Sequence, residues 1–255
     1  KLPVSNRLIR QTHKILMRGV RGKHKQPGAF RNSQNWIGGA SLRDATFIPP
    51  PHHEVPGLMS DLEKFLHNQN IHVPELVRIG IAHYQFETIH PFLDGNGRVG
   101  RLLITLYLVS KGLLSQPALY ISDFFERNRN LYYDNLHNVR VRNNLAQWLK
   151  FFMVGVIETS ESSIQTFKDI LALKSRLEKD IQQLNKKAIN AKKLITYLFR
   201  QPIVTSNDVQ KEIDISAPTA NTLLNDFVRL GILEEQTGYQ RNRVFHFEHY
   251  LKLFQ

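Results

Sequence analysis

One stretch decides the fold of this 255-residue chain: His90-Pro91-Phe92-Leu93-Asp94-Gly95-Asn96-Gly97-Arg98-Val99-Gly100-Arg101. Before it, residues 74–88 predict a strong helix with Pro74 in the first turn. Pro91 ends that helix, because proline has no N–H to donate and restricts the residue before it. After the glycines, residues 98–111 predict a buried helix that Gly112 closes. The sequence therefore predicts a glycine-rich turn between two helices.

The glycines give this turn the properties of an anion site. Gly95, Gly97 and Gly100 allow backbone amides to approach a ligand closely. They lie where a loop enters a helix, so free N–H groups and the helix dipole point at one spot. Arg98 and Arg101 are three residues apart, so they share a helix face and can bind two phosphates.

Two further side chains suggest chemistry at the same place. Asp94 is the only carboxylate of the stretch, and a carboxylate beside phosphates suits a hard cation such as Mg²⁺. His90 lies across the turn, where an imidazole could accept a proton from an attacking hydroxyl near pH 7. A base, a metal ligand, backbone amides and two cations are what phosphoryl or nucleotidyl transfer requires.

Other loops share parts of this pattern. A calcium loop would begin like Asp94-Gly95-Asn96, but it requires an acceptor at Arg98, Gly at Val99 and Glu at Thr105. A phosphate-binding Walker loop requires Lys-Ser/Thr after its last glycine, which this stretch lacks. The histidine spacings match no zinc template. A structural helix start with surface arginines is the remaining alternative.

The twelve residues resemble the signature of the Fic family, HPFx(D/E)GN(G/K)RxxR, at every defined position. Residues 28–31, 35–39 and 47–51 also resemble the upstream region of Fic proteins that carry winged-helix tails. The resemblance covers roughly residues 1–155, and the whole chain more loosely. It implies a helical fold and the transfer of AMP from ATP to a Tyr, Thr or Ser hydroxyl of a protein.

The resemblance also implies a role for each residue of the signature. His90 would be the general base, Phe92 a core anchor, and Asp94 the ligand of Mg²⁺. The residues expected to bind ATP are Gly95, Asn96, Gly97, Arg98, Gly100, Arg101 and Tyr133, the last near the adenine. The position after Asn96 is Gly97, as in members that transfer AMP, whereas the phosphotransferring Doc-like branch tends to have Lys there.

Upstream of the signature, residues 35–48 predict a hairpin that resembles the family's flap. A flap aligns the target segment by strand pairing. The residues expected to contact the target are Trp36, Ile37, Gly38 and Ile48.

Many Fic proteins carry an inhibitory helix, (S/T)xxxE(G/N), whose Glu pairs with the second arginine of the signature, here Arg101. No segment of the chain matches it, and the nearest, residues 122–126, is followed by Arg127. In the branch that this chain resembles, the helix lies upstream of residues 8–17. We therefore expect that it preceded Lys1, in which case this chain would be deregulated.

The composition restricts the class of protein. With 42% hydrophobic residues and 15 Phe, the chain can build a packed core. It has no cysteine, which excludes disulfides and cysteine-ligated metals and fits a cytoplasmic location. We expect no membrane span and find no signal peptide at Lys1. The net charge of +12 favours phosphate-bearing partners.

The expected fold class is mainly α: a Fic-type helical bundle with a small β-hairpin flap, followed by a winged-helix domain. The expected domains are a catalytic domain at 1–160, a connector helix at 161–185 and a winged helix-turn-helix domain at 186–255. The last has the order helix, strand (203–205), two helices and a hairpin (232–247). The side chains suited to DNA are Thr219, Asn221, Thr222, Arg241 and Arg243. The alternative is that this module only packs on the catalytic domain or mediates dimers.

The sequence thus predicts a Mg²⁺-dependent protein adenylyltransferase, a nucleotidyltransferase that uses ATP. Its partner would be a target protein with an acceptor hydroxyl, which includes the enzyme itself, and a homodimer is left open. One alternative is a DNA-binding regulator in which the signature only senses nucleotide. Another is a Fic enzyme that transfers a different phosphate-linked group or removes AMP.

Overall fold

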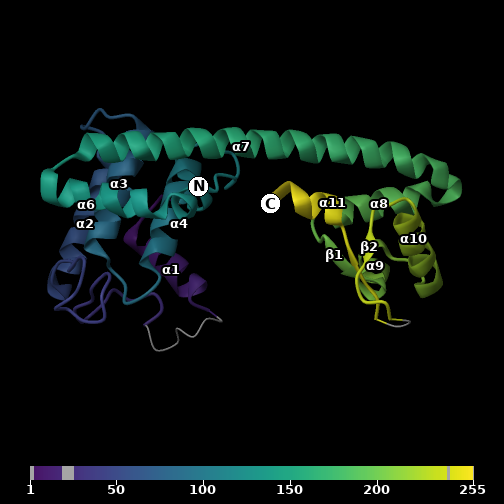
Figure 1. The fold of residues 1–255 in the computed structure, drawn as a ribbon, viewed down its shortest axis with the longest axis horizontal. Helices are drawn as coiled ribbons and strands as arrows, with labels where there is room; N and C mark the ends of the chain where they lie inside the picture. The colour runs from purple at the N-terminus through teal and green to yellow at the C-terminus, as the bar shows by residue number, and fades with distance from the viewer. Residues whose placement is uncertain (1–2, 19–25, 240–241, 255) are drawn as a thin grey trace. The chain divides into compact units, whose positions relative to one another are not determined.

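The computed structural model describes residues 3–18, 26–239 and 242–254. The chain divides into two compact units, Lys1–Glu161 and Ser162–Gln255 (Figure 1). Each unit has its own hydrophobic core, so each is described by itself. All but the first of the residues expected to form a connector, 161–185, fall within the second unit, and most of them continue a helix that begins in the first.

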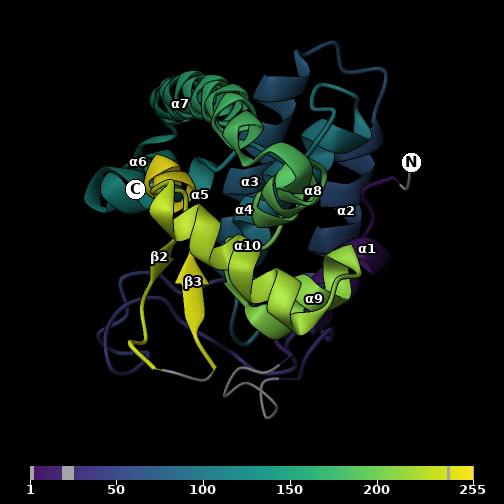
Figure 2. The same cartoon turned by 90° about the vertical axis from the view of Figure 1, so that its right-hand side faces the viewer.

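The first unit is helical. Its helices are α1 (Asn6–Leu16), α2 (Val55–His67), α3 (Glu75–Ile89), α4 (Asn96–Ser110), α5 (Ile121–Arg127), α6 (Arg129–Arg142) and the beginning of α7 (Leu145–Asp180), with a 3-10 turn at His52–Glu54. The expected helices around the signature are present, with ends that differ by one or two residues. The short helix α5 was not predicted. Helices α3 and α4 pack together over a core that includes Phe86, Phe92 and Trp148 (Figures 1 and 2).

Helix α7 replaces two helices expected from the sequence. The sequence predicts one helix over residues 145–159 and a separate connector helix after it, but Leu145–Asp180 is one continuous helix of 36 residues. At the expected break, the Ser160 hydroxyl donates to the carbonyl of Val156 at 2.6 Å, so this polar side chain is satisfied within the helix. Gly155 lies inside the helix, where a Cβ would come within 2.5 Å of the Phe124 ring. The glycine therefore permits close packing and does not end the helix.

The expected hairpin at 35–48, called the flap loop below, is not a regular hairpin. It contains one antiparallel bridge, between Ile37 and Phe47, with N–H···O distances of 2.9 and 3.1 Å. The chain between them curls around Asp44, whose carboxylate accepts from the amides of Ala40 and Ser41 at 2.7 Å each. The side-chain bonds of Asp44 thus replace the backbone ladder that a hairpin would form.

The second unit has the expected order of elements. After the end of α7 and a 3-10 segment (Ile181–Lys187) come α8 (Ala188–Leu198), β1 (Ile203–Thr205), α9 (Ser206–Ile213), α10 (Ala217–Arg229), β2 (Glu234–Glu235), β3 (Val244–His246), α11 (Glu248–Leu251) and a 3-10 turn (Lys252–Phe254). The strands form an antiparallel sheet in the order β1-β3-β2. Phe227, Phe245 and Phe247 are fully buried in its core.

Two local features of the second unit differ from what its sequence predicts. The sequence favours Ser206 as the N-cap of the helix after the first strand, but the N-cap of α9 is Thr205, which forms a capping box with Asp208. The sequence also favours a hairpin turn at residues 237–238, but β2 ends at Glu235 and β3 begins at Val244. Between them, Gln240 and Arg241 lie outside the described residues.

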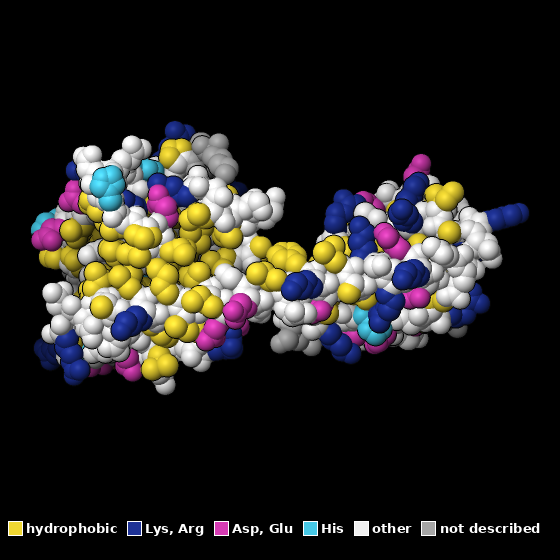
Figure 3. All heavy atoms as spheres, turned by 90° about the horizontal axis from the view of Figure 1, so that it is seen from above, with side chains coloured by type: hydrophobic (Ala, Val, Ile, Leu, Met, Phe, Trp, Pro, Cys, Tyr) yellow, Lys and Arg dark blue, Asp and Glu magenta, His cyan; other side chains and the backbone are white. Residues whose placement is uncertain are grey.

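Apolar side chains gather on the face of the first unit that Figure 3 presents. Val154 and Ile157 of α7 are about half exposed. Exposed apolar areas of this kind are typical of interaction surfaces. Within the described ranges, no helix combines the length and apolar character that crossing a bilayer requires.

Candidate nucleotide-binding site

His90 lies at the end of α3 in a left-handed conformation, with φ 50° and ψ 61°. This conformation is uncommon for a residue with a side chain, so surrounding contacts must hold it. The His90 amide donates to the carbonyl of Phe86 at 2.9 Å, and the His90 carbonyl accepts from Nε of Arg31 at 3.0 Å. Arg31 is itself buried. The backbone of His90 is therefore fixed on both sides.

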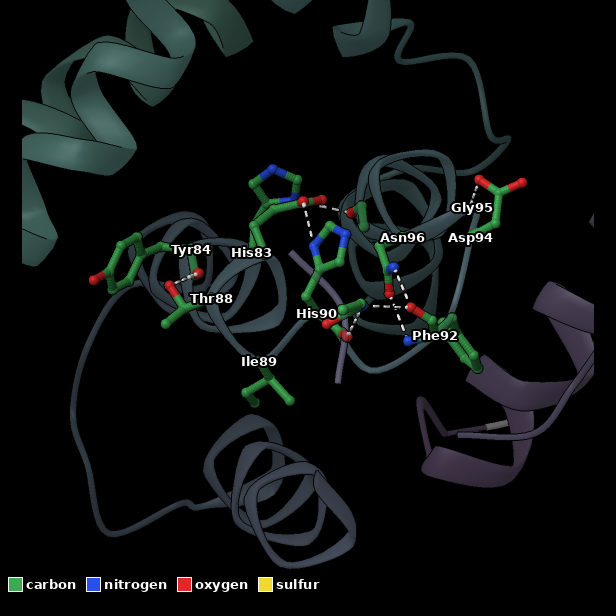
Figure 4. A network of polar contacts seen from close by, with 12 residues as sticks. His83, Tyr84, Thr88, Ile89, His90, Phe92, Asp94, Gly95 and Asn96 are labelled. Carbon is green, nitrogen blue, oxygen red and sulfur yellow. Dashed lines mark hydrogen bonds and ion pairs between the residues drawn. The ribbon is translucent and has the colours of Figure 1, made fainter. Parts of the chain in front are cut away.

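The signature loop is closed by Asn96, the first residue of α4. Its Oδ1 accepts from the Phe92 amide at 2.8 Å, and its Nδ2 donates to the Phe92 carbonyl at 2.7 Å (Figure 4). The side chain is buried and these two bonds use both of its polar groups. The structure thus assigns the Asn96 side chain to the loop, and only its backbone amide remains for the expected contact with phosphate.

His13 of α1 holds the other side of the loop. Its Nδ1 accepts from the Gly28 amide at 2.8 Å, so Nε2 carries the proton and donates to the Asp94 carbonyl at 3.0 Å. Burial lowers the pKa of His13. No sequence signal identified this residue, because the contact joins segments 81 residues apart.

The N-terminus of α4 presents its backbone amides. Its N-cap is Gly95 at φ 81°, and no side chain caps the first turn. A Cβ at Gly95 would lie 3.2 Å from the Met17 sulfur, so both conformation and space favour glycine. The half-exposed Arg98 reaches to within 3.9 Å of Asp94. Free amides and a cation at a helix N-terminus are the features from which the sequence predicts an anion site.

Asp94 is half exposed beside these amides. Its Oδ1 accepts from the Gly95 amide at 2.6 Å, and its Oδ2 lies 3.9 Å from Nη2 of Arg98. Among the residues that the structure describes, no group of three His, Cys, Asp or Glu could hold a metal alone. Mg²⁺ commonly takes one or two protein carboxylates together with substrate phosphates. A single carboxylate at this position is compatible with that mode.

Gly97 and Gly100 lie in different surroundings. A Cβ at Gly97 would lie 3.2 Å from Nη1 of Arg101, so this glycine gives the Arg101 side chain room. A Cβ at Gly100 would lie 2.3 Å from Oε1 of Glu87 on α3. The structure therefore places Gly100 in the contact between α3 and α4.

The His90 ring is mostly buried, and the electrostatics keep it neutral. Burial lowers the pKa of His90 to about 4, and the nearby Arg31 and Arg140 act in the same direction. The Glu87 backbone and the Asp94 charge oppose this shift. A neutral imidazole at pH 7 can accept a proton, as a general base must.

Glu87, Arg101 and Arg140 form a buried charged group beside His90. Burial raises the pKa of Glu87 to about 7, although Arg101 and Arg140 oppose the rise. The sequence analysis assigned no role to Glu87 or Arg140. The available signal was the position of Glu87, which lies three residues before His90 and so shares a face of α3 with it.

The two tyrosines of α6 have different environments. Tyr132 is buried, and its hydroxyl lies 3.0 Å from Nε2 of His83. Tyr133 is about half exposed and lies edge-on to Tyr132, with ring centroids 5.3 Å apart. Tyr132 is thus a core residue, and Tyr133 has the exposed ring that a contact with adenine would need.

The flap loop carries the side chains expected to contact a target. Trp36 and Ile48 are exposed, and Ile37 forms the single bridge of the loop. Gly38 has φ 71°, and a Cβ there would lie 2.3 Å from the Thr46 hydroxyl. Asn35, at the start of the loop, donates to the Phe92 carbonyl at 3.0 Å. The flap loop is thereby tied directly to the signature loop.

The segment nearest to the inhibitory pattern lies on α5. Its Glu126 is exposed and lies 3.7 Å from Arg129.

The side chains expected to contact DNA lie in the second unit. On α10, Thr219, Asn221 and Thr222 are exposed. Arg243 donates to Asn225 at 2.9 Å and lies 3.6 Å from Glu235, which lowers its availability to DNA phosphates. Arg241 lies outside the described residues.

Comparisons with known proteins support the resemblance read from the signature. Residues 3–108 match the model of the Fic/DOC family. A probable protein adenylyltransferase of Aquifex aeolicus is 38% identical over 112 residues, which cover 44% of this chain and 32% of that protein. A protein adenylyltransferase of Caenorhabditis elegans is 30% identical over 143 residues, 56% of this chain and 25% of that protein.

A solved structure extends the similarity to most of the chain. It is a Fic family protein from Desulfovibrio desulfuricans, 25% identical, with a TM-score of 0.55 over 95% of this chain and 68% of that one. The chain spans a third or less of the two curated relatives. The matches therefore show that residues 3–108 are similar to the Fic/DOC family.

Proposed function

We propose that the first unit is a protein adenylyltransferase, which transfers AMP from ATP to a Tyr, Thr or Ser hydroxyl of a protein. One observation carries the proposal: the neutral, buried imidazole of His90 ends α3 at the loop that leads into the uncapped N-terminus of α4. A base is thus held beside an anion site. The names of the matched relatives, both protein adenylyltransferases, support the same reaction.

In this reaction the acceptor oxygen attacks the α-phosphorus of ATP, and the bond from that phosphorus to the pyrophosphate oxygen breaks. His90 accepts the proton of the hydroxyl as the new O–P bond forms. The amides of the first turn of α4, with Arg98 and Arg101, stabilise the charge on the phosphates. Asp94 would hold Mg²⁺, which neutralises phosphate charge when bound.

Gly97 supports AMP as the transferred group, because the phosphotransferring branch tends to have Lys at that position. Transfer of another phosphate-linked group, removal of AMP and nucleotide sensing are the competing functions. The target segment would pair with the flap loop near Ile37, and the enzyme itself is included among the targets.

We also propose that the second unit is a winged helix, since its order of elements is the expected one. Contact with DNA would use the exposed side chains of α10, and a gel-shift titration across salt concentrations tests it.

The reaction requires ATP, and a chain without cysteine suits a reducing compartment, so we place the protein in the cytoplasm.

Labelled ATP tests the proposed reaction. Incubation with α-labelled ATP and Mg²⁺ should label protein, and γ-labelled ATP should not. His90→Ala should abolish the label, whereas His137→Ala, an exposed histidine of α6, should retain it. Label from the γ-phosphate would indicate phosphotransfer, and ATP binding without any label would indicate a sensor.

A further inference from the structure

We propose that Glu87 is a positioning residue for His90: its carboxylate holds Nδ1 of the imidazole and stabilises the imidazolium that forms during transfer. This inference rests on the proposed function and adds a residue that lies outside the signature. Glu87 touches neither phosphate nor acceptor, so it would act only through His90.

The geometry of α3 places the two side chains together. Glu87 and His90 are three residues apart at the end of the helix, so they share one face. Oε2 of Glu87 lies 4.0 Å from Nδ1 of His90. A hydrogen bond needs about 2.8 Å, so side-chain movement of about 1 Å would form one. Catalytic hydrogen bonds are often long before the substrate binds.

Several polar atoms around this pair are buried and have no hydrogen-bond partner. Within the described part of the chain, they include Nδ1 of His90, Oε1 of Glu87, and Nε of both Arg101 and Arg140. Each of the two arginines interacts electrostatically with Glu87. A buried charged group without full hydrogen bonding is costly. This arrangement destabilises the fold locally, which favours a role in function over a role in packing.

The approach of α4 makes room for this carboxylate. Gly100 has no side chain, and Oε1 of Glu87 lies 2.3 Å from where its Cβ would be. A larger residue at position 100 would push Glu87 away from His90. Gly100, at a position that the Fic signature leaves undefined, thus makes room for the Glu87 carboxylate in the α3–α4 contact.

The chemistry follows from the orientation of the ring. The Glu87 carboxylate faces Nδ1, so in this proposal Nδ1 carries the proton and Nε2 remains free to accept one. When the acceptor hydroxyl gives its proton to Nε2, the ring becomes positive. The Glu87 carboxylate then stabilises it through Nδ1–H, and no proton passes to Glu87.

The charged and titratable groups around the pair come from several elements. Arg101 of α4 and Arg140 of α6 act on Glu87, Glu87 acts on Tyr132 of α6, and Arg31 and Asp94 act on His90. The two arginines favour the ionised form of Glu87, whereas burial favours its neutral form. Ionisation of Glu87 near pH 7 would therefore control how well the imidazolium is stabilised.

Arg140 also connects this pair to the flap loop. Its guanidinium lies over the Phe47 ring, 3.7 Å from the centroid, and Phe47 pairs with Ile37 in the single bridge. A target that pairs with the flap loop would thus contact the segment that Arg140 supports. The electrostatic environment of Glu87 is thereby linked to the place where the target binds.

The test compares Glu87→Gln with Glu126→Gln, an exposed glutamate of α5. Glu87→Gln keeps the size of the side chain and the backbone carbonyl but removes the charge. We expect kcat for AMP transfer to fall about 10- to 100-fold, with KM for ATP within about twofold. The rise of kcat with pH near 7 should disappear in Glu87→Gln and remain in Glu126→Gln.

A second readout does not depend on activity. In protein labelled with ¹⁵N at histidine, the imidazole shifts of His90 report which nitrogen carries the proton. Wild type should hold the proton on Nδ1, and Glu87→Gln should show a mixture of tautomers. Unchanged shifts with unchanged kcat would overturn the inference, because the Glu87 backbone alone would then position the ring. If wild type itself transfers no AMP, the proposed function fails instead, and the shifts still test the pair.

Discussion

The His13 ring stacks on the Phe92 ring, with centroids 3.8 Å apart and planes inclined by 8°. The same imidazole bonds the Gly28 amide and the Asp94 carbonyl. One side chain of α1 therefore holds the apolar anchor of the signature loop and the backbone of its metal-ligand candidate together.

Replacing His13 should destabilise the first unit. His13→Ala removes a buried stacked ring and two hydrogen bonds, and we expect a loss of about 2–4 kcal/mol. Urea unfolding followed by tryptophan fluorescence measures it, because both tryptophans of the chain, Trp36 and Trp148, lie in the first unit. His137→Ala is the matched control. An unchanged urea midpoint for His13→Ala would contradict the structural role given to this stack.

The stability of the first unit should fall as the pH is lowered from 6.5 toward 4. Burial lowers the pKa of His83 and of His90 to about 4, and lowers that of His13. The unfolded chain then binds more protons than the folded one in this window, so stability present above pH 6.5 is lost with acidification. At about 1.4 kcal/mol per pKa unit, His83 and His90 contribute at most about 3.5 kcal/mol each.

Glu87 has the opposite effect on how the stability of the first unit depends on pH. Its pKa is raised to about 7 in the folded state, so its contribution is complete below pH 4.5 and is lost as the pH rises through 7. Urea titrations at pH 4.5, 6 and 8 separate the two effects. His90→Gln should reduce the loss of stability between pH 6 and pH 4.5, and Glu87→Gln should raise stability at pH 8. A Glu87→Gln variant less stable than wild type at pH 8 would indicate that the carboxylate is structural.

Two glycines should respond in opposite ways to alanine. Gly100→Ala places a methyl 2.3 Å from Glu87, so we expect a loss of about 1–3 kcal/mol and lower activity. Gly57 lies within α2 with no atom within 4 Å of a built Cβ, so Gly57→Ala should stabilise by about 1 kcal/mol. Thermal unfolding followed by tryptophan fluorescence compares them. Equal effects at both positions would refute the close contact between α3 and α4.

Local patterns predicted the elements around the signature. Pro74 and Gly112 marked the ends of the two helices, and apolar spacing marked their buried faces. The seven-residue helix α5 was not predicted, because it spans too few turns to give a periodic pattern of apolar residues. The break expected near residue 160 was wrong. Residues 145–180 contain no proline, and α7 continues through them without interruption. Such boundaries depend on weak local preferences.

The candidate site was predictable where its residues are adjacent in the chain. His90, Asp94 and the arginines of the signature lie within twelve residues, so their spacing carries the chemistry. His13, Glu87 and Arg140 act through tertiary packing, which a single sequence does not display. Asn96 was assigned to the nucleotide as part of the signature and Gly100 as one of the glycines beside it. In the structure the Asn96 side chain closes the loop, and Gly100 makes room for Glu87.

The most direct test of the central claim is the intact mass of the protein after incubation with ATP and Mg²⁺. If His90 is a general base beside an amide-lined phosphate site, the mass of the protein or of an added target should increase by that of AMP. His90→Ala should gain nothing, and His137→Ala should behave as wild type. An AMP adduct of equal yield in His90→Ala, or a phosphate adduct in wild type, would contradict the account.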